Sequence, residues 1–417
     1  MGSRQLLPHQ PEHPAELTQI LYRDAALADG RSPTLQLGVS VLVDDGRIVW
    51  IRPSDSEEDA RDAEVIDAGG ATIVPGMVDC HSHLTLPGGS HWIDRGSDTP
   101  EQLLGYAEHN AKLQTNAGVR WARDVGAPVG VDPHDGRERA LSLGLRDRWH
   151  GHRHYPYVRA AGTWVTRAGT LPAGLTAEAK DGDELLALAL RQLDDGADLV
   201  KLYLDGPDPD TSPWTANEVR RVVDAAHERG AKVTAHSGRI SGARICADAP
   251  VDCVEHGFEL DADCARLMSE RGVALVSTLT VLKSWTSFGK TTTIERFATA
   301  EGKQRIAERW DAARESIRHA HAAGVLLGAG TDFGGGSPRA NQLAWEVEAL
   351  VESGLEPWEA LAAVTWKAGE ILGEPEAGQV AEGGPADFFL VHGDPLSDPS
   401  ALWRVWRIAW VETSARR

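Results

Sequence analysis

The chain has 417 residues, of which 41% are hydrophobic and 25% are charged, a composition typical of a globular protein rather than a disordered one. It carries 42 lysine and arginine residues against 62 aspartate and glutamate residues, so its formal net charge is −20. We therefore expect neither nucleic acid nor an anionic membrane surface as a main partner, because both attract a basic surface.

The sequence predicts a cytoplasmic protein without a membrane span. We expect residues 1–17 to be a leader, and they lack the apolar segment of a signal peptide. No run of about 18 apolar residues occurs along the chain. The four cysteines form no CxxC pair and are too few for a disulfide framework, so a reducing compartment is the simplest expectation.

Both ends of the chain predict short strands and turns. In residues 18–75, apolar runs flank Asp45 and Gly46, a pair that is typical of a β hairpin. Residues 376–417 contain similar short apolar runs. We expect the two segments to form one small β-sandwich domain, with residues 76–375 inserted between them.

In the inserted segment, short apolar runs alternate with helical patterns that end at glycines. Eight such runs occur, at residues 73–83, 119–126, 157–166, 197–206, 231–238, 251–257, 272–280 and 324–333. This alternation implies parallel strands with right-handed crossovers. Eight units predict an α/β fold, a closed (β/α)8 TIM-like barrel, with an open doubly wound sheet as the alternative.

Ionisable side chains stand at the ends of these runs. A barrel carries its chemistry at the carboxyl ends of its strands. The run ends supply four histidines, one lysine and one aspartate, namely His81, His83, His236, His256, Lys201 and Asp332; Glu255 directly precedes His256. The i, i+2 spacing of the first two histidines points both rings to one side of a strand. A single such histidine is more often structural, but imidazole and carboxylate groups from several strands together predict a divalent metal site.

Five segments, in order, resemble the signatures of the amidohydrolase superfamily of metal-dependent hydrolases. They read VPGMVDCHSHL, VKLYLDG, VTAHSG, VEHG and GAGTDF. Within that superfamily the chain is most similar to the branch that contains imidazolonepropionase and the prolidase-like peptidases, including ochratoxin-hydrolysing relatives. The resemblance covers residues 20–410.

The resemblance implies a pair of divalent ions, zinc being our expectation. His81, His83 and Asp332 would bind one ion and His236 and His256 the other, with a carboxylated Lys201 bridging the two. Asp332 would also be catalytic, accepting a proton from the attacking water and delivering it to the leaving amine. The expected reaction is hydrolysis of a C–N bond in a small molecule, either a prolidase-like substrate or an N-acyl amino acid.

Other functions stay open at this point. An imidazolonepropionase-like cyclic amidohydrolase or a deaminase would use one metal and no bridging lysine, so that Lys201 would instead reach solvent or bind a substrate carboxylate. A lactonase or esterase would use the same activated water. A non-catalytic barrel that binds a ligand is the alternative outside enzymes, and metal content would separate these functions.

Candidate substrate contacts follow the predicted strands. They are Trp164, Arg167, Tyr203, Arg239 and Trp285. Many prolidase-like relatives carry a histidine or tyrosine just after the fifth-strand histidine, where this chain has Ser237 and Gly238. We expect Arg239 to replace a lost contact to a substrate carboxylate, a surface arginine being the alternative. The sequence is also compatible with a homo-oligomer.

Overall fold

The computed structural model describes residues 19–57, 60, 62–172, 174–206, 208 and 210–410. The predicted leader, residues 1–17, lies outside the described residues. Among the helices of the described part, none is both long and apolar enough to cross a membrane.

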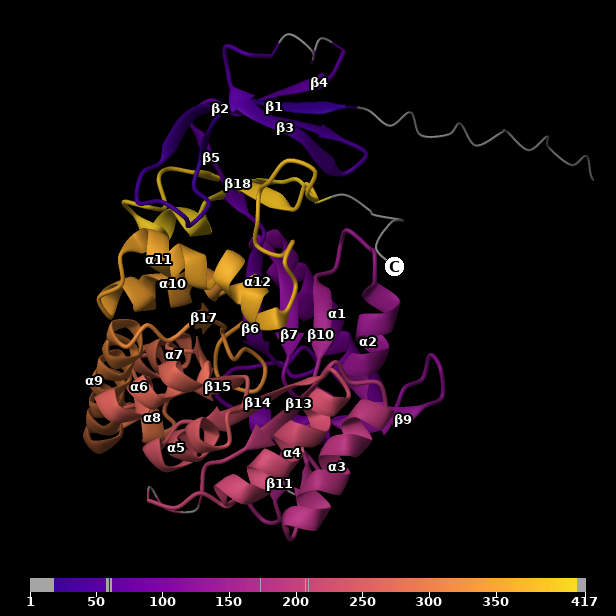
Figure 1. Ribbon diagram of the computed structural model, residues 1–417, viewed down its shortest axis with the longest axis vertical. Coiled ribbons are helices and arrows are strands. Elements are labelled where there is room, and N and C mark those ends of the chain that lie inside the picture. The colour runs from indigo at the N-terminus through magenta and orange to yellow at the C-terminus, as the bar shows by residue number, and fades with distance from the viewer. Residues whose placement is uncertain are drawn as a thin grey trace, which may run out of the picture.

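One sheet contains strands from both ends of the chain, and it forms the top of the molecule in Figure 1. Its order is β19-β18-β5-β1-β2-β3, with β4 beside β1. The strands are β1 (Ile20–Leu27), β2 (Gln36–Asp44), β3 (Arg47–Pro53), β4 (Glu64–Asp67), β5 (Ala71–Pro75), β18 (Phe388–His392) and β19 (Val405–Ile408). Antiparallel pairing of β18 with β5 joins the two chain ends. The sandwich arrangement and the domain boundaries stay predictions.

The hairpin predicted at Asp45 and Gly46 connects β2 to β3, which pair antiparallel up to Asp44 and Arg47. Asp45 has φ 44° and Gly46 has φ 71°. Positive φ at both positions is typical of the tight turn that matches the twist of two adjacent strands.

The middle of the chain builds two parallel sheets, with orders β10-β7-β6 and β12-β11-β13-β14-β15-β16-β17. The smaller sheet contains β6 (Met77–Ser82), β7 (Val119–Asp124) and β10 (Tyr157–Ala160). The larger contains β11 (Val165–Arg167), β12 (Ala177–Ala179), β13 (Leu199–Tyr203), β14 (Lys232–Ser237), β15 (Cys253–His256), β16 (Ala274–Ser277) and β17 (Leu327–Ala329). The predicted α/β class with parallel strands is therefore confirmed.

Two predicted runs differ in detail from the strands that form. The run 157–166 is divided between β10 and β11, which belong to different sheets. Gly162, at φ 77°, lies between them and turns the chain. The run 324–333 forms only the short β17, so Asp332 lies beyond the strand.

Backbone hydrogen bonds connect the two parallel sheets at both margins. At one margin the Asp198 amide, just before β13, donates to the Ala160 carbonyl of β10 at 2.8 Å. At the other, the Asp332 amide donates to the His81 carbonyl at 2.8 Å, and the His83 amide donates to the Phe333 carbonyl at 2.9 Å. The second margin therefore places the end of β6 beside the segment that follows β17.

Helices lie around the outside of these strands (Figure 1). They are η1 (Trp92–Ser97), α1 (Pro100–Asn116), α2 (Leu141–Trp149), α3 (Gly182–Asp194), α4 (Ala216–Glu228), α5 (Ile240–Asp248), α6 (Ala262–Arg271), α7 (Thr280–Phe288), α8 (Glu295–Ala298), α9 (Ala300–Ala322), α10 (Leu343–Glu352), α11 (Pro357–Ala363), α12 (Trp366–Leu372) and η2 (Pro399–Trp403). A short antiparallel pair, β8 (Val129–Val131) and β9 (Glu138–Ala140), precedes α2. Capping boxes begin α1 at Thr99 and α4 at Thr215.

Candidate metal centre and active-site cavity

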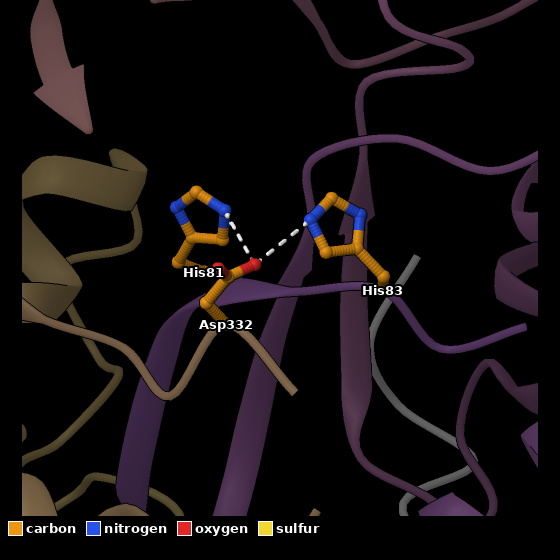
Figure 2. A group of neighbouring side chains, drawn as sticks. All are labelled: His81, His83 and Asp332. Atoms are coloured by element: carbon orange, nitrogen blue, oxygen red, sulfur yellow. Dashed lines mark ion pairs between the residues drawn. The ribbon is translucent and has the colours of Figure 1, made fainter. Parts of the chain in front are cut away.

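Three of the predicted metal ligands meet at the end of β6. His81 and His83 direct their Nε2 atoms at the same oxygen, Asp332 Oδ1, at 3.3 and 3.2 Å (Figure 2). One ligand atom from each of the three buried residues lies within 4.8 Å of the others. The i, i+2 spacing of the histidines therefore places both rings on one side, as the sequence predicts.

The backbone around Asp332 is held in an unusual conformation. Asp332 has φ 53° and His256 has φ 74°, values that residues other than glycine rarely adopt. Both carboxylate oxygens of Asp79 bind Thr331, one accepting from its amide at 3.0 Å and the other from its hydroxyl at 2.8 Å. Gly330 packs so closely on β6 that a Cβ there would lie 2.4 Å from the His81 nitrogen. Such strain persists where neighbouring contacts fix the chain, often at functional sites.

The far nitrogen of each β6 histidine has its own partner. His83 Nδ1 lies 2.8 Å from the Gly126 carbonyl, and His81 Nδ1 lies 2.7 Å from Glu255 Oε2. Both partners are acceptors, which favours a proton on each Nδ1. With the proton there, each Nε2 would offer its lone pair to a metal.

Glu255 is the centre of a buried charge network that the sequence analysis assigned no role. Its side chain is fully buried and accepts from Arg123 Nη2 at 2.6 Å and from the Thr234 hydroxyl. Burial alone would raise the pKa of this carboxyl, but the charges of Arg123 and Lys201 and the His81 ring hold it well below its usual range. Glu255 is therefore an anion beside the candidate metal centre. In the sequence, its position next to His256 was the one signal that could have drawn attention to it.

The other two predicted histidine ligands pack against this group. The His256 ring centroid lies 4.6 Å from that of His81 and 4.4 Å from that of His236. His256 Nδ1 is 2.7 Å from the Thr278 hydroxyl. His236 Nε2 is instead 3.1 Å from Asp205 Oδ2, a contact that the sequence analysis missed. The structure thus brings all four histidines together, while the three-residue group is the one set of possible ligands that converges among the described residues.

The side chain of Lys201, on β13, is buried near Glu255. The Lys201 side chain is 0% exposed, and its Nζ makes no hydrogen bond with any described residue. Burial lowers the pKa of the amine to about 8, against the opposing charge of Glu255. A buried amine without a hydrogen-bond partner is unfavourable, so this position calls for a further group.

A cavity of about 350 Å³ opens beside the centre. Its lining includes Asp332, His236 and His256. Three predicted substrate contacts line it as well: Tyr203, Arg239 and Trp285.

Two predicted substrate contacts lie elsewhere. Trp164 is buried and stacks on the His83 ring with centroids 4.7 Å apart, and the Arg167 guanidinium lies 5.0 Å above the Trp214 ring. Neither residue is part of the cavity lining. The lining contains instead two arginines that the sequence analysis missed, Arg296 and Arg309.

Comparison with known proteins shows the family of this chain. The profile of the amidohydrolase family matches residues 72–409. An uncharacterized protein of Mycobacterium tuberculosis is 31% identical, over 88% of this chain and 89% of its own. The ochratoxinase of Aspergillus niger is 28% identical, over 80% of this chain and 74% of its own.

The fold has solved relatives too. The crystal structure of a Xaa-Pro dipeptidase with bound methionine superposes with a TM-score of 0.78 at 23% identity, covering 95% of this chain and 100% of that one. The match to the family profile spans most of the sequence and includes every residue of the candidate centre. The chain therefore belongs to the amidohydrolase family, and it is a hydrolytic enzyme that acts on carbon–nitrogen bonds.

Proposed function

We propose that this enzyme is a metal-dependent amidohydrolase that cleaves the amide bond of a small dipeptide-like or N-acyl amino acid substrate. The observation that carries the proposal is the convergence of His81, His83 and Asp332 at the edge of a cavity large enough for such a molecule. Two imidazole nitrogens and one carboxylate oxygen are a donor set that suits zinc and similar divalent ions.

Two zinc ions per chain are the metal content that we propose. His81, His83 and Asp332 would hold one ion, His236 and His256 the other, and Lys201, carboxylated on its amine, would bridge them. Support comes from the buried Nζ, which makes no hydrogen bond with any described residue. Carboxylation would replace a buried cation by an anion with two acceptor oxygens beside the imidazoles. When bound, a divalent ion supplies a Lewis acid for the carbonyl and lowers the pKa of a water.

The protein's own residues then have distinct tasks. Asp332 would accept the proton of the attacking water and return it to the leaving nitrogen, a role that its position in the cavity lining supports. Glu255 orients the His81 ring through the 2.7 Å bond to Nδ1. The Gly126 carbonyl does the same for His83.

We also propose that the two parallel sheets form a closed (β/α)8 barrel, with the chain ends forming a β sandwich. Backbone bonds at both margins, from Asp198 to Ala160 and from Asp332 to His81, support closure. Closure would gather the strand ends that carry the six proposed ligands around one opening.

A single-metal enzyme is the second candidate. It is favoured by His236, whose Nε2 lies 3.1 Å from Asp205 rather than within the three-residue group. In that case the reaction would resemble that of a cyclic amidohydrolase or a deaminase, and Lys201 would contact the substrate.

Metal content tests the proposal directly. The protein would be purified without chelator in the presence of bicarbonate, and its metals measured by inductively coupled plasma mass spectrometry. We expect two zinc ions per wild-type chain and at most one in Lys201→Met, with Lys180→Met, an exposed lysine, as the matched control. Release of amines from N-acyl amino acids and Xaa-Pro dipeptides would be measured in parallel. One ion in the wild type would favour the single-metal candidate, and none after metal addition would contradict both.

A further inference from the structure

We propose that the substrate of this site is an anionic amide, whose carboxylate is bound by Arg309 and Arg296 and whose apolar side group packs beside Trp285. The inference rests on the proposed amide hydrolysis for the reacting bond. The proposed binding of the substrate carboxylate depends on residues outside the candidate metal centre.

Both arginines border two adjoining cavities. Arg309 on α9 and Arg296 on α8 line the active-site cavity together with Asp332. They also line a second cavity of about 230 Å³, whose walls include Trp285 and Phe297. Arg296, Arg309 and Trp285 thus line both cavities, and a molecule that extends from one cavity into the other would pass all three.

Arg309 has no partner for its charge among the described residues. It makes no ion pair or hydrogen bond with any of them, and its Nε is buried. Other arginines on the same helix are paired, since Arg305 lies 3.3 Å from Glu301 and Arg318 contacts Glu315. A guanidinium carries five donors, and a buried unsatisfied donor is costly. A carboxylate, with its two oxygens, is the ligand whose geometry best matches this group.

The loop after β14 makes room for this arginine. A Cβ at Gly238 would lie 2.9 Å from Arg309 Nη2, so a larger residue there would displace the guanidinium. On its other side, Arg309 Cζ lies 5.3 Å from the centre of the Phe258 ring. Packing thus holds the guanidinium in place. The same Cβ would lie 3.1 Å from Asp205 Oδ2, so a carboxylate stands near the guanidinium, although the two form no ion pair.

The carboxylates that line the active-site cavity have other partners. Asp332 belongs with His81 and His83 to the group that would bind the metal. Asp205 lies against the ring of His236 and accepts from the amides of Gly238 and Arg239 at 3.1 and 3.2 Å.

Three arginines and two aspartates line the cavity, so its formal charge is positive by one unit when the histidines are neutral. Arg296 donates to the Ser90 carbonyl at 3.2 Å, which leaves its charge uncompensated by that contact. The cavity carries this local positive charge in a chain whose net charge is −20. A selective attraction for an anionic substrate follows.

The second cavity indicates what kind of side group the substrate carries next to its carboxylate. Besides the arginines, its walls include Trp285, Phe297 and Ile306. A hydrophobic or aromatic side group would bury apolar surface there. An N-acyl amino acid or dipeptide with a bulky apolar residue next to its free carboxylate combines both features.

A matched pair of substrates tests the inference: N-acetyl-L-phenylalanine and its neutral carboxamide, with acetate release measured for both. We expect wild-type kcat/KM to be at least about tenfold higher for the acid, a charge-assisted bond being worth about that factor or more. Arg309→Gln should lose about tenfold to a hundredfold on the acid and change less than about twofold on the carboxamide. Arg318→Gln, on the same helix with a side chain 44% exposed, is the control and should change neither.

Binding separates a failure of this inference from a failure of the proposed reaction. If the holoenzyme turns over neither compound, calorimetry with N-acetyl-L-phenylalanine would still show affinity that falls in Arg309→Gln. That result would retain the anion site and count against hydrolysis of N-acyl amino acids. Equal turnover or equal binding of acid and carboxamide by the wild type would overturn the anion site and leave the hydrolase assignment standing. If the thermal unfolding midpoint of Arg309→Gln matches that of the control Arg318→Gln, misfolding of Arg309→Gln is excluded.

Discussion

Replacing Glu255 by glutamine should weaken both the fold and the metal centre, for separable reasons. The carboxylate is fully buried and bonds to Arg123 Nη2 at 2.6 Å and to His81 Nδ1 at 2.7 Å. Glutamine keeps the size of the side chain but removes its charge. Arg123, itself buried, would then lack a counter-ion, while its other bond, from Nε to the Cys80 carbonyl at 2.6 Å, remains.

The size of the effect follows from that geometry. Removing one partner of a buried ion pair costs about 3–5 kcal/mol of unfolding free energy. We expect about 3 kcal/mol, the lower end of that range, because the amide oxygen still accepts from Arg123. Loss of a carboxylate partner to a ligating histidine lowers metal affinity by about tenfold to a hundredfold. Urea unfolding in chelator would measure the first effect, and titration against a competing chelator the second.

A second variant distinguishes the two effects. Adding Arg123→Met to Glu255→Gln removes the stranded cation, so part of the lost stability should return. Metal affinity should stay low, because the His81 Nδ1 still lacks a carboxylate. The reasoning is refuted if Glu255→Gln costs less than about 1 kcal/mol, or if the double variant is as unstable as the sum of its parts.

Four further outcomes are expected. Asp332→Asn should retain metal better than turnover, since an amide cannot accept the proton, and turnover equal to the wild type would remove Asp332 from the acid–base role. Gly330→Ala should lower stability and zinc content, because its Cβ would lie 2.4 Å from the His81 nitrogen. Gly105→Ala, in α1 with nothing within 4 Å, should instead raise unfolding free energy by about 0.5–1 kcal/mol. Chelator should lower the thermal unfolding midpoint of the wild type more than that of His83→Ala, measured by scanning calorimetry.

Local pattern was sufficient to predict the parallel strands and the residues at their ends. His81 and His83 follow an apolar run that forms a strand, and strand geometry alone sets the direction of their side chains. The Asp45–Gly46 turn was likewise predictable, because its backbone conformation depends on those two residues. The ends of the strands were less predictable. Asp332 lies beyond β17, because hydrogen bonds to β6 fix its backbone rather than its own strand propensity.

Contacts between distant segments set the limit of prediction at the site. Glu255 and His81 are 174 residues apart, and nothing in either segment specifies that they bond. Arg309 sits in a long helix whose pattern does not mark one arginine as different from the next. Trp164 was predicted as a pocket residue from its place after a strand, whereas its ring packs on His83.

Prediction of the site from the sequence is limited because its charged groups come from distant segments of the chain. The proposed histidine and lysine ligands stand on their own strands or at the ends of them, so each is visible in the sequence. The charge balance is shared by Lys201, Glu255, Arg123 and Asp332, which come from four separate segments and interact electrostatically. Each of these groups changes the energy of ionising the others, so substitutions among them should not be additive. The centre therefore behaves as one electrostatic unit, and that property arises only when the chain has folded.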